Sequence, residues 1–392
     1  MILSRSACLL SVIAWGAAGL PLPVRACQIC LPIPTRSAAD FLIEADAVVL
    51  ARENPDKPFS LKAVEVLKGE ISSTEIDLFL DSQTRRLLAL HPGRRVVCVH
   101  RAQDPDAGWR RIGVANEVLD PIVREILGRS ADWAANPGER PAYFARFLGH
   151  EDAQLRTLAH LEVARAPYDE IRKLGGALPP GEIRVFLENY RYIEWHALYI
   201  LLLAQSGEKV DRERIVGSIE SAARFSLSTQ LAAWATAFIE IEEDTALDFL
   251  EERYFRDPGR SLDEMRALQA ALSVHGARGH THLRGRIAEL YRLLLGSRPE
   301  MAPRIAADLM LWEHWGLGDA VAGIAASPPE SIEFGEIVQL RAYARLAREA
   351  RVPPVVAHHS RESSPGTPVF VIVVVVLCLV PVVLGMHRRR RG

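Results

Sequence analysis

The sequence predicts an α+β protein of several domains: a small antiparallel β-barrel, then an all-α helical array, and one C-terminal transmembrane helix. Three observations lead to this fold class. Short alternating segments separated by Gly and Pro turns occupy residues 45–116. Apolar residues at helical spacing, punctuated by Gly and Pro, continue from there to about residue 350. An apolar run long enough to cross a bilayer lies close to the end of the chain.

The two ends of the chain predict export and anchoring. Residues 1–26 have the form of a secretory signal peptide, with Arg5 before an apolar stretch and a small-residue cleavage site before Cys27. Residues 369–386, from Val369 to Met386, are almost entirely apolar and are followed by a basic tail, residues 387–392, which contains Arg388, Arg389, Arg390 and Arg391. Arginines at one end of a membrane helix stay in the cytoplasm. We therefore expect a single-pass type I protein of the bacterial cell membrane, with its bulk periplasmic or extracellular.

Both ends leave an alternative open. Cys27 follows the signal peptide at the position of a lipidated cysteine, although Arg25 is out of place in a lipoprotein cleavage site. The tail also has the plan of a surface-sorting signal, although residues 364–368 match no known sorting word. We favour a free Cys27 and a plain anchor.

Charge and cysteine content describe the exported part. The whole chain carries a formal charge of −2, and removing six arginines with the two ends leaves about −8. A mildly acidic chain argues against nucleic acid as a partner, because nucleic-acid binding requires a basic face.

Three cysteines remain in the exported part: Cys27, Cys30 and Cys98. An odd number is explained most simply by one disulfide and one remaining thiol. We expect Cys98 to pair with either Cys27 or Cys30.

Five strands are expected in the first domain. They cover residues 47–51, 59–67, 75–80, 95–99 and 109–114, with turns at residues 68–70 and 91–93. In the second strand the alternation directs Phe59, Leu61, Ala63 and Val66 inward. Strands this short, separated by Gly and Pro turns, are typical of a small barrel or sandwich.

Helices are expected over residues 117–350. Residues 117–127 have apolar side chains at helical spacing, Pro180 opens another helix, and residues 261–264 have the form of a capping box. Punctuated units of about 15 to 20 residues indicate helix pairs with a period of about 40, as in α-solenoids. One irregular all-α domain is the alternative. Residues 351–368, rich in Pro and Ser, are interpreted as a flexible spacer before the membrane.

Three short motifs carry a family resemblance. They are Cys27-Gln28-Ile29-Cys30, then residues 44–51 (EADAVVLA) and residues 64–69 (VEVLKG). In this order and spacing they resemble the netrin-like/TIMP-like domain, a five-stranded OB-fold barrel, over residues 27–116. The helical remainder resembles the HEAT-like repeat segments attached to such domains in bacterial membrane-anchored envelope proteins.

The resemblance implies a role for the N-terminus. In tissue inhibitors of metalloproteinases the amino group and carbonyl of the N-terminal cysteine chelate the zinc of the protease. Cys27 takes this position if cleavage follows Ala26. The chain departs from the pattern, because it has Cys-x-x-Cys in place of Cys-x-Cys and has cysteines for a single bridge.

The remaining motifs favour structural roles. A redox role for Cys27 and Cys30 requires a thioredoxin-like unit, which does not surround them. His275, His280 and His282 form no known zinc motif, and we expect an exposed loop there. The acidic residues 240–244 are interpreted as the end of one helix and the start of the next. The aromatic residues are expected to pack between stacked helices: Tyr190, Tyr192, Trp195, Tyr199, Trp312 and Trp315.

The sequence therefore predicts no catalytic, cofactor-binding or metal site and no cofactor. The favoured function is that of a non-enzymatic, membrane-tethered scaffold, with another protein and the lipid bilayer as partners. A TIMP-like metalloprotease inhibitor acting through Cys27 is one alternative. A thiol oxidoreductase using Cys27 and Cys30 is the other.

Overall fold

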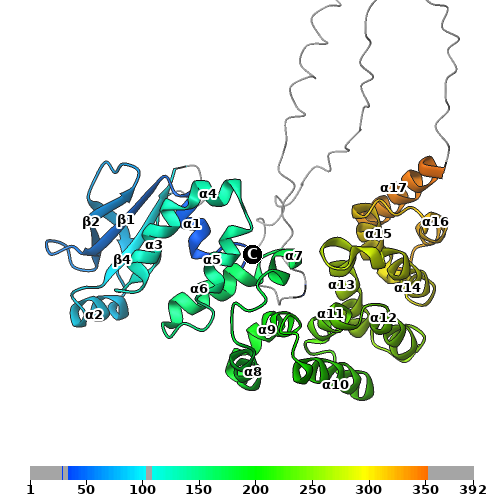
Figure 1. Cartoon of the computed structure of the whole chain (residues 1–392). Helices are drawn as coiled ribbons and strands as arrows, with labels where there is room; N and C mark the ends of the chain where they lie inside the picture. Colours follow the sequence, from blue (N-terminus) through cyan, green and yellow to red (C-terminus); the bar gives the residue numbers. More distant parts are fainter. Residues whose placement is uncertain (1–28, 30–33, 103–107, 352–392) are drawn as a thin grey trace, which may run out of the picture. The chain divides into compact units, whose positions relative to one another are not determined.

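The computed structural model describes residue 29, residues 34–102 and residues 108–351 (Figure 1). Over these residues the chain forms a curled five-stranded antiparallel sheet, a half-barrel, followed by many helices. The α+β class is confirmed. The expected signal peptide, membrane segment 369–386 and basic tail lie outside the described residues, as does the spacer apart from Arg351. Within the described ranges, no helix is long and apolar enough to cross a membrane.

All five expected strands are present. They are β1 (Ala47–Glu53), β2 (Ser60–Lys68), β3 (Glu75–Phe79), β4 (Arg95–Arg101) and β5 (Gly108–Ala115). Their order in the sheet is β3-β2-β1-β4-β5, and each pair of neighbours is antiparallel. The two ends of this order, β3 and β5, also come into contact, so the sheet curls toward closure.

Two helices of this region were not expected. Helix α1 (Ala38–Glu44) precedes β1, and α2 (Ser82–Leu90) connects β3 to β4 (Figure 1). Each begins at a capping side chain: Ser37 forms a capping box with Asp40, and Asp81 accepts a hydrogen bond from the backbone of Thr84. These caps satisfy N–H groups that the first helical turn leaves without partners.

The inward face of β2 was predicted in part. Leu61 is buried and Ala63 packs on the inner core, as expected. Val66 is 44% exposed, so its predicted inward direction is wrong. The pairing of β2 with β1 contains two register shifts, and an extra residue at a bulge reverses the alternation of side chains. The inward prediction for Phe59 is also wrong: it lies before β2, 39% exposed and stacked on Phe79.

The central strands β1 and β4 are buried on both faces. Alternate residues, among them Val49 and Cys98, enter a small core inside the half-barrel. Their neighbours, among them Leu50 and Val97, enter a second core on the outer face, which continues through the helices as far as Tyr343. The helices therefore cover the sheet, and the domain boundary expected near residue 116 stays a prediction.

The helical region begins as expected, with α3 at Leu119–Gly128. The capping box at Ser261 and the helix start at Pro180 are confirmed. Shorter turns connect several of the helices, including a 3-10 turn at Thr281–Leu283. The further α-helices are α4 (Ser130–Ala135), α5 (Glu139–Ala145), α6 (Ala153–Ala164), α7 (Tyr168–Arg172), α8 (Pro180–Glu188), α9 (His196–Leu203), α10 (Lys209–Phe225), α11 (Leu231–Glu242), α12 (Asp244–Leu250), α13 (Leu262–Arg278), α14 (Arg284–Ser297), α15 (Ala302–Leu311), α16 (Gly318–Ala326) and α17 (Phe334–Arg351).

The contacts between these helices define a layered array. Helices α9, α11, α13, α15 and α17 contact one another in succession and form one layer. Helices α12, α14 and α16 likewise contact one another in succession and form a second layer. Consecutive helices such as α11 and α12, or α16 and α17, connect the layers. Each helix pair therefore packs on the next pair along the chain.

Candidate functional site

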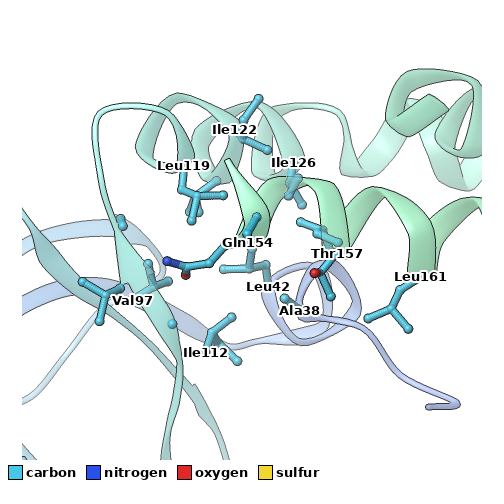
Figure 2. Close-up of a pocket in the computed structure, with 16 residues that line it drawn as sticks. Ala38, Leu42, Val97, Ile112, Leu119, Ile122, Ile126, Gln154, Thr157 and Leu161 are labelled. Carbon is cyan, nitrogen blue, oxygen red and sulfur yellow. The ribbon is translucent and has the colours of Figure 1, made fainter. Parts of the chain in front are cut away.

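An apolar cavity lies where the helices cover the outer face of the half-barrel (Figure 2). Its volume is about 420 Å³. Val97 of β4 and Ile112 of β5 line it from the sheet. Leu42 of α1, Ile126 of α3 and Leu161 of α6 are among the residues that line it from the helices. Strands of the half-barrel and the helices that cover them therefore form the cavity together.

Gly113 of β5 leaves space at one wall of the cavity. A Cβ atom built on Gly113 would lie 3.7 Å from Oε1 of Gln154, an ordinary contact distance, so no neighbour fills the space beside its backbone. A glycine inside a strand weakens the strand but marks a place where another group approaches the backbone. Gly113 therefore contributes room to the cavity and no side chain.

The polar side chains of the lining are Gln154 and Thr157, both on α6. Figure 2 shows both of them among the apolar side chains of the lining. Asp152 caps the start of α6 by accepting hydrogen bonds from the backbone N–H groups of Gln154 (2.9 Å) and Leu155 (3.0 Å), which fixes the position of this turn. An amide and a hydroxyl can orient a bound group without carrying charge.

The lining of the cavity is uncharged. Among the residues that the structure describes, no Asp, Glu, His, Lys, Arg or Cys side chain lines it. General acid–base and nucleophilic catalysis depend on such groups. Burying apolar groups contributes about 0.8 kcal/mol for each methylene removed from water. The arrangement can therefore hold an aliphatic or aromatic group, and its lining contains no group that would act on it by acid–base chemistry.

A second cavity, of about 530 Å³, has a mixed lining of apolar and charged side chains, and three of these, Arg140, Glu162 and Arg165, belong to a largely buried ion network. Arg140 of α5 contacts Asp40 of α1 (2.7 Å) and Glu162 of α6 (2.7 Å). Arg165 contacts Asp40 at 2.6 Å. Burial acts to raise the pKa of Asp40, but the hydrogen bond from Ser37 and the two arginines outweigh it, so the pKa lies below its usual value. Because these charges satisfy one another, we assign the network to holding α1 against α5 and α6.

Cys98, the one predicted site residue that is described, lies inside the half-barrel. It carries a free thiol with no exposed surface. Burial raises the pKa of this thiol to about 12, so it is protonated and unreactive at neutral pH. Cys27 and Cys30, its expected partners, lie outside the described residues, so the disulfide expected from Cys98 stays a prediction. Val369, Met386 and Arg388 to Arg391 also lie outside these residues.

Half of the six aromatic residues expected between helices are buried, and Tyr192 and Trp315 are half-buried. Trp195, Tyr199 and Trp312 are buried, which confirms that they pack between helices. Tyr190 is 77% exposed, so the prediction fails for this residue. The acidic residues 240–244 end α11 and begin α12, as expected.

The exposed loop expected at the three histidines is wrong for His275. This residue lies on α13 with no exposed surface and is held by the carbonyl of Thr236. His280 and His282 follow in the turn before α14, and together with Glu240 and Glu243 the three histidines form two groups of potential metal ligands. Sequence reasoning missed the two glutamates, because they belong to the preceding helix pair.

Comparisons with known proteins add no family assignment. The chain matches no protein-family model, and neither the curated proteins nor the solved structures include a significant match to it. Of the netrin-like resemblance, the structure supports one part: a five-stranded half-barrel is followed by a helical region.

Proposed function

We propose that this protein is a non-enzymatic, membrane-tethered binding protein outside the cytoplasm, and that its apolar cavity receives apolar side chains of a partner protein. The observation that carries the proposal is the lining of the cavity between the half-barrel and the helices, which is apolar and free of titratable groups. Apolar pockets with a few polar groups are the usual form of binding sites.

A protein partner suits the surroundings of the cavity. Stacked helix pairs present an extended surface beside it, as in α-solenoids that bind other proteins. An amphipathic helix or loop binds such a surface by placing a few apolar anchors in a pocket. The rim groups on Gln154 and Thr157 can bond to the backbone of such a segment, and neither selects a charged ligand.

The proposal includes an OB or netrin-like half-barrel, HEAT-like helices and a membrane anchor. A sheet with β1 at its centre and β3 next to β5 is the strand arrangement of a partly open five-stranded barrel, which supports an OB or netrin-like origin. The two-layered helices support a HEAT-like origin for the remainder. The membrane anchor rests on the apolar sequence of residues 369–386.

The two alternative functions gain less support. Both depend on Cys27 and Cys30, which lie outside the described residues. Cys98 offers an oxidoreductase no reactive thiol, because it is buried and its pKa is raised to about 12. A binding role is therefore the function that the described residues support best.

Photocrosslinking in living cells tests the binding role. The photoreactive residue p-benzoylphenylalanine is placed at Gln154, which is exposed at the rim, and in a control protein at Ala326, which is exposed at the end of α16. We expect a discrete protein adduct at Gln154 that is absent at Ala326. Adducts with phospholipid alone at Gln154, or the same adducts at both positions, would show that the cavity does not receive a protein.

A further inference from the structure

Two neighbouring turns of the helical array bring histidines and glutamates together. Glu240 and Glu243 lie where α11 ends and α12 begins. His280 and His282 lie between α13 and α14, one helix pair further along the chain. In each of the groups Glu240–His275–His280 and Glu243–His280–His282, the atoms able to bind a metal lie within 4.8 Å of one another.

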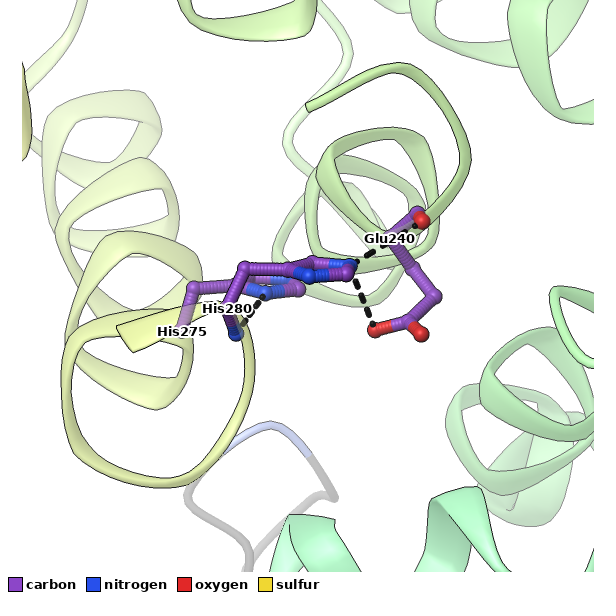
Figure 3. A group of neighbouring side chains, drawn as sticks. All are labelled: Glu240, His275 and His280. Atoms are coloured by element: carbon purple, nitrogen blue, oxygen red, sulfur yellow. Dashed lines mark hydrogen bonds and ion pairs between the residues drawn. The ribbon is translucent and has the colours of Figure 1, made fainter. Parts of the chain in front are cut away.

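His280 belongs to both groups, and its hydrogen bonds decide which of its nitrogens is available. Its Nε2 lies 3.2 Å from the backbone carbonyl oxygen of Glu240 and 3.5 Å from the carboxylate Oε2 of the same residue (Figure 3). Both oxygens only accept, so Nε2 carries the proton in this arrangement. The other nitrogen, Nδ1, then keeps its lone pair and lies 3.9 Å from Oε1 of Glu243.

We propose that Glu243, His280 and His282 bind a zinc ion, through a carboxylate oxygen of Glu243, Nδ1 of His280 and Nε2 of His282. Without the ion, Nε2 of His282 donates a hydrogen bond to Oε2 of Glu243, 2.8 Å away, so its proton must be released or move to Nδ1 when the ion binds. Two ligand atoms of a tetrahedral zinc site are about 3.3 Å apart, given metal–ligand bonds of about 2.0–2.1 Å. The observed separations of 2.8 and 3.9 Å bracket this value, and the ligand atoms of the group all lie within 4.8 Å of one another, so the side chains stand close to the spacing that the ion requires.

Glu240 acts as the outer partner of His280 and not as a ligand. Its carboxylate already accepts hydrogen bonds from Arg172 Nε (2.8 Å) and from the Tyr168 hydroxyl (2.9 Å). A carboxylate that accepts from the distal nitrogen of a metal-bound histidine fixes the tautomer and the direction of the ring. Glu240, oriented by Arg172 and Tyr168, stands in this position relative to His280.

His275 supports the site from inside the core. Its Nε2 donates to the carbonyl of Thr236 at 2.9 Å, and its ring stacks on that of His280, with centroids 5.4 Å apart and planes 4° from parallel (Figure 3). Gly279 makes this packing feasible, because a Cβ there would lie 2.5 Å from Nδ1 of His275. His275 is thus a positioning residue that holds the plane of the His280 ring.

The backbone at Glu243 is held in an unusual conformation. Its φ is 46° and its ψ is −117°, in the region of positive φ that side chains other than glycine disfavour. Strained residues of this kind cluster at functional sites. The side chains of Glu243 and His282 are 48% and 60% exposed, so an ion from solution can reach them.

The ligand types select the ion. Two imidazoles and one carboxylate suit Zn²⁺, whereas Ca²⁺ and Mg²⁺ take oxygen ligands. Three protein ligands leave a fourth position for water. Because Glu243 belongs to one helix pair and His280 and His282 to the next, the ion would connect the two pairs.

Calorimetric titration of the full-length, detergent-solubilised and chelator-treated protein with zinc chloride tests the site. We expect one equivalent of zinc to bind. His282→Ala and Glu243→Gln should each weaken binding at least about 100-fold, because losing a direct ligand costs no less than losing an outer partner, which costs up to about 100-fold. The matched control His91→Ala removes an exposed histidine on the half-barrel and should bind as the native protein does.

Two further measurements keep the test decisive. The double variant His358→Ala/His359→Ala removes the other histidine pair of the chain and should retain binding. X-ray absorption should show two imidazoles and only nitrogen or oxygen ligands at about 2.0–2.1 Å. Unchanged affinity in His282→Ala and Glu243→Gln, loss of binding in the double variant, or no binding to the native protein would each overturn the proposal. Circular dichroism of the chelated variants checks that they fold.

Discussion

The contact between Gly276 and Trp312 provides a sharp test of how the helices of the array pack. Gly276 lies on α13, and Trp312 follows the end of α15. A Cβ atom built on Gly276 would lie 2.1 Å from Cζ2 of Trp312 and 2.4 Å from Cη2. Carbon atoms in contact lie about 3.5–4.0 Å apart, so Gly276→Ala requires the indole ring to move by about 1.4 Å or more.

The indole ring has little freedom to move. Trp312 is 7% exposed and stacks on Tyr291, with ring centroids 5.6 Å apart. The Tyr291 hydroxyl donates to buried Asp308 at 2.6 Å, so a displaced ring disturbs this hydrogen bond as well. Overpacking costs about 1–3 kcal/mol, and a displacement this large belongs at the upper end. The higher helix propensity of alanine stabilises the folded state by about 1 kcal/mol, so the free energy of unfolding should fall by about 2 kcal/mol in total.

The matched control is Gly217→Ala on α10, where an added Cβ meets nothing within 4 Å. This change should raise the free energy of unfolding by about 0.5–1 kcal/mol, because alanine favours the helix and nothing is displaced. Urea unfolding of the full-length protein, followed by tryptophan fluorescence, measures both variants. If Gly276→Ala were as stable as the native protein, the close approach of α13 to Trp312 would be wrong.

Three further substitutions or modifications test individual features. Burial, together with Arg156, lowers the pKa of His160 to about 4. As the pH falls, the unfolded chain therefore binds a proton at His160 before the folded protein does, so the folded state loses stability between about pH 6.5 and pH 4. Urea unfolding with a chelator present measures this loss. Between about pH 7 and pH 5, the free energy of unfolding should fall by about 2 kcal/mol more in the native protein than in His160→Gln. Cys98 should resist iodoacetamide in the native state and react after denaturation without reductant, as peptide mapping will show; a requirement for reductant would mean that it forms a disulfide. Arg140→Leu removes the closest cation from buried Glu162, whose next cation, Arg165, is 3.7 Å away, and leaves Asp40 with Arg165 alone; it should lower the free energy of urea unfolding by about 3 kcal/mol. Arg212→Leu breaks an exposed pair and should cost less than about 1 kcal/mol; equal losses in the two variants would refute the role given to the buried network.

Local patterns predicted the strands and many of the helices, and the errors have local causes. The alternation of apolar residues identified β1 to β5 because the sheet has a buried inner face. It failed at Val66, because bulges in β2 reverse the alternation and leave no mark in the residue types. Helices α1 and α2 were missed because each is only 7 to 9 residues long, too short for a clear period.

The cavity and the histidine cluster depend on contacts between distant residues. His160 meets Tyr199, His275 meets Thr236 and His282 meets Glu243, and each pair is 39 residues apart in the chain. This separation agrees with the period of about 40 residues indicated by the punctuation of the helices. Polar residues spaced by one period are therefore the signal that would have identified such partners. No comparable signal marks the cavity, because α1, α6 and the outer face of the sheet meet only in the folded protein.

The measurement that most directly tests the binding role is the yield of the protein adduct with and without Gly113→Leu, with the photoreactive residue at Thr157, an exposed residue of the lining, because Gln154 itself contacts residue 113. A Cβ at residue 113 fits at ordinary contact distance, 3.7 Å from Oε1 of Gln154, and because Gly113 lines the cavity, the larger leucine side chain takes up space proposed for the partner's apolar anchor. Excluding one such anchor costs at least about 1.4 kcal/mol, so we expect the adduct yield to fall about tenfold or more at subsaturating partner. An unchanged yield from a folded Gly113→Leu protein would show that the partner binds elsewhere and that the cavity is not the binding site.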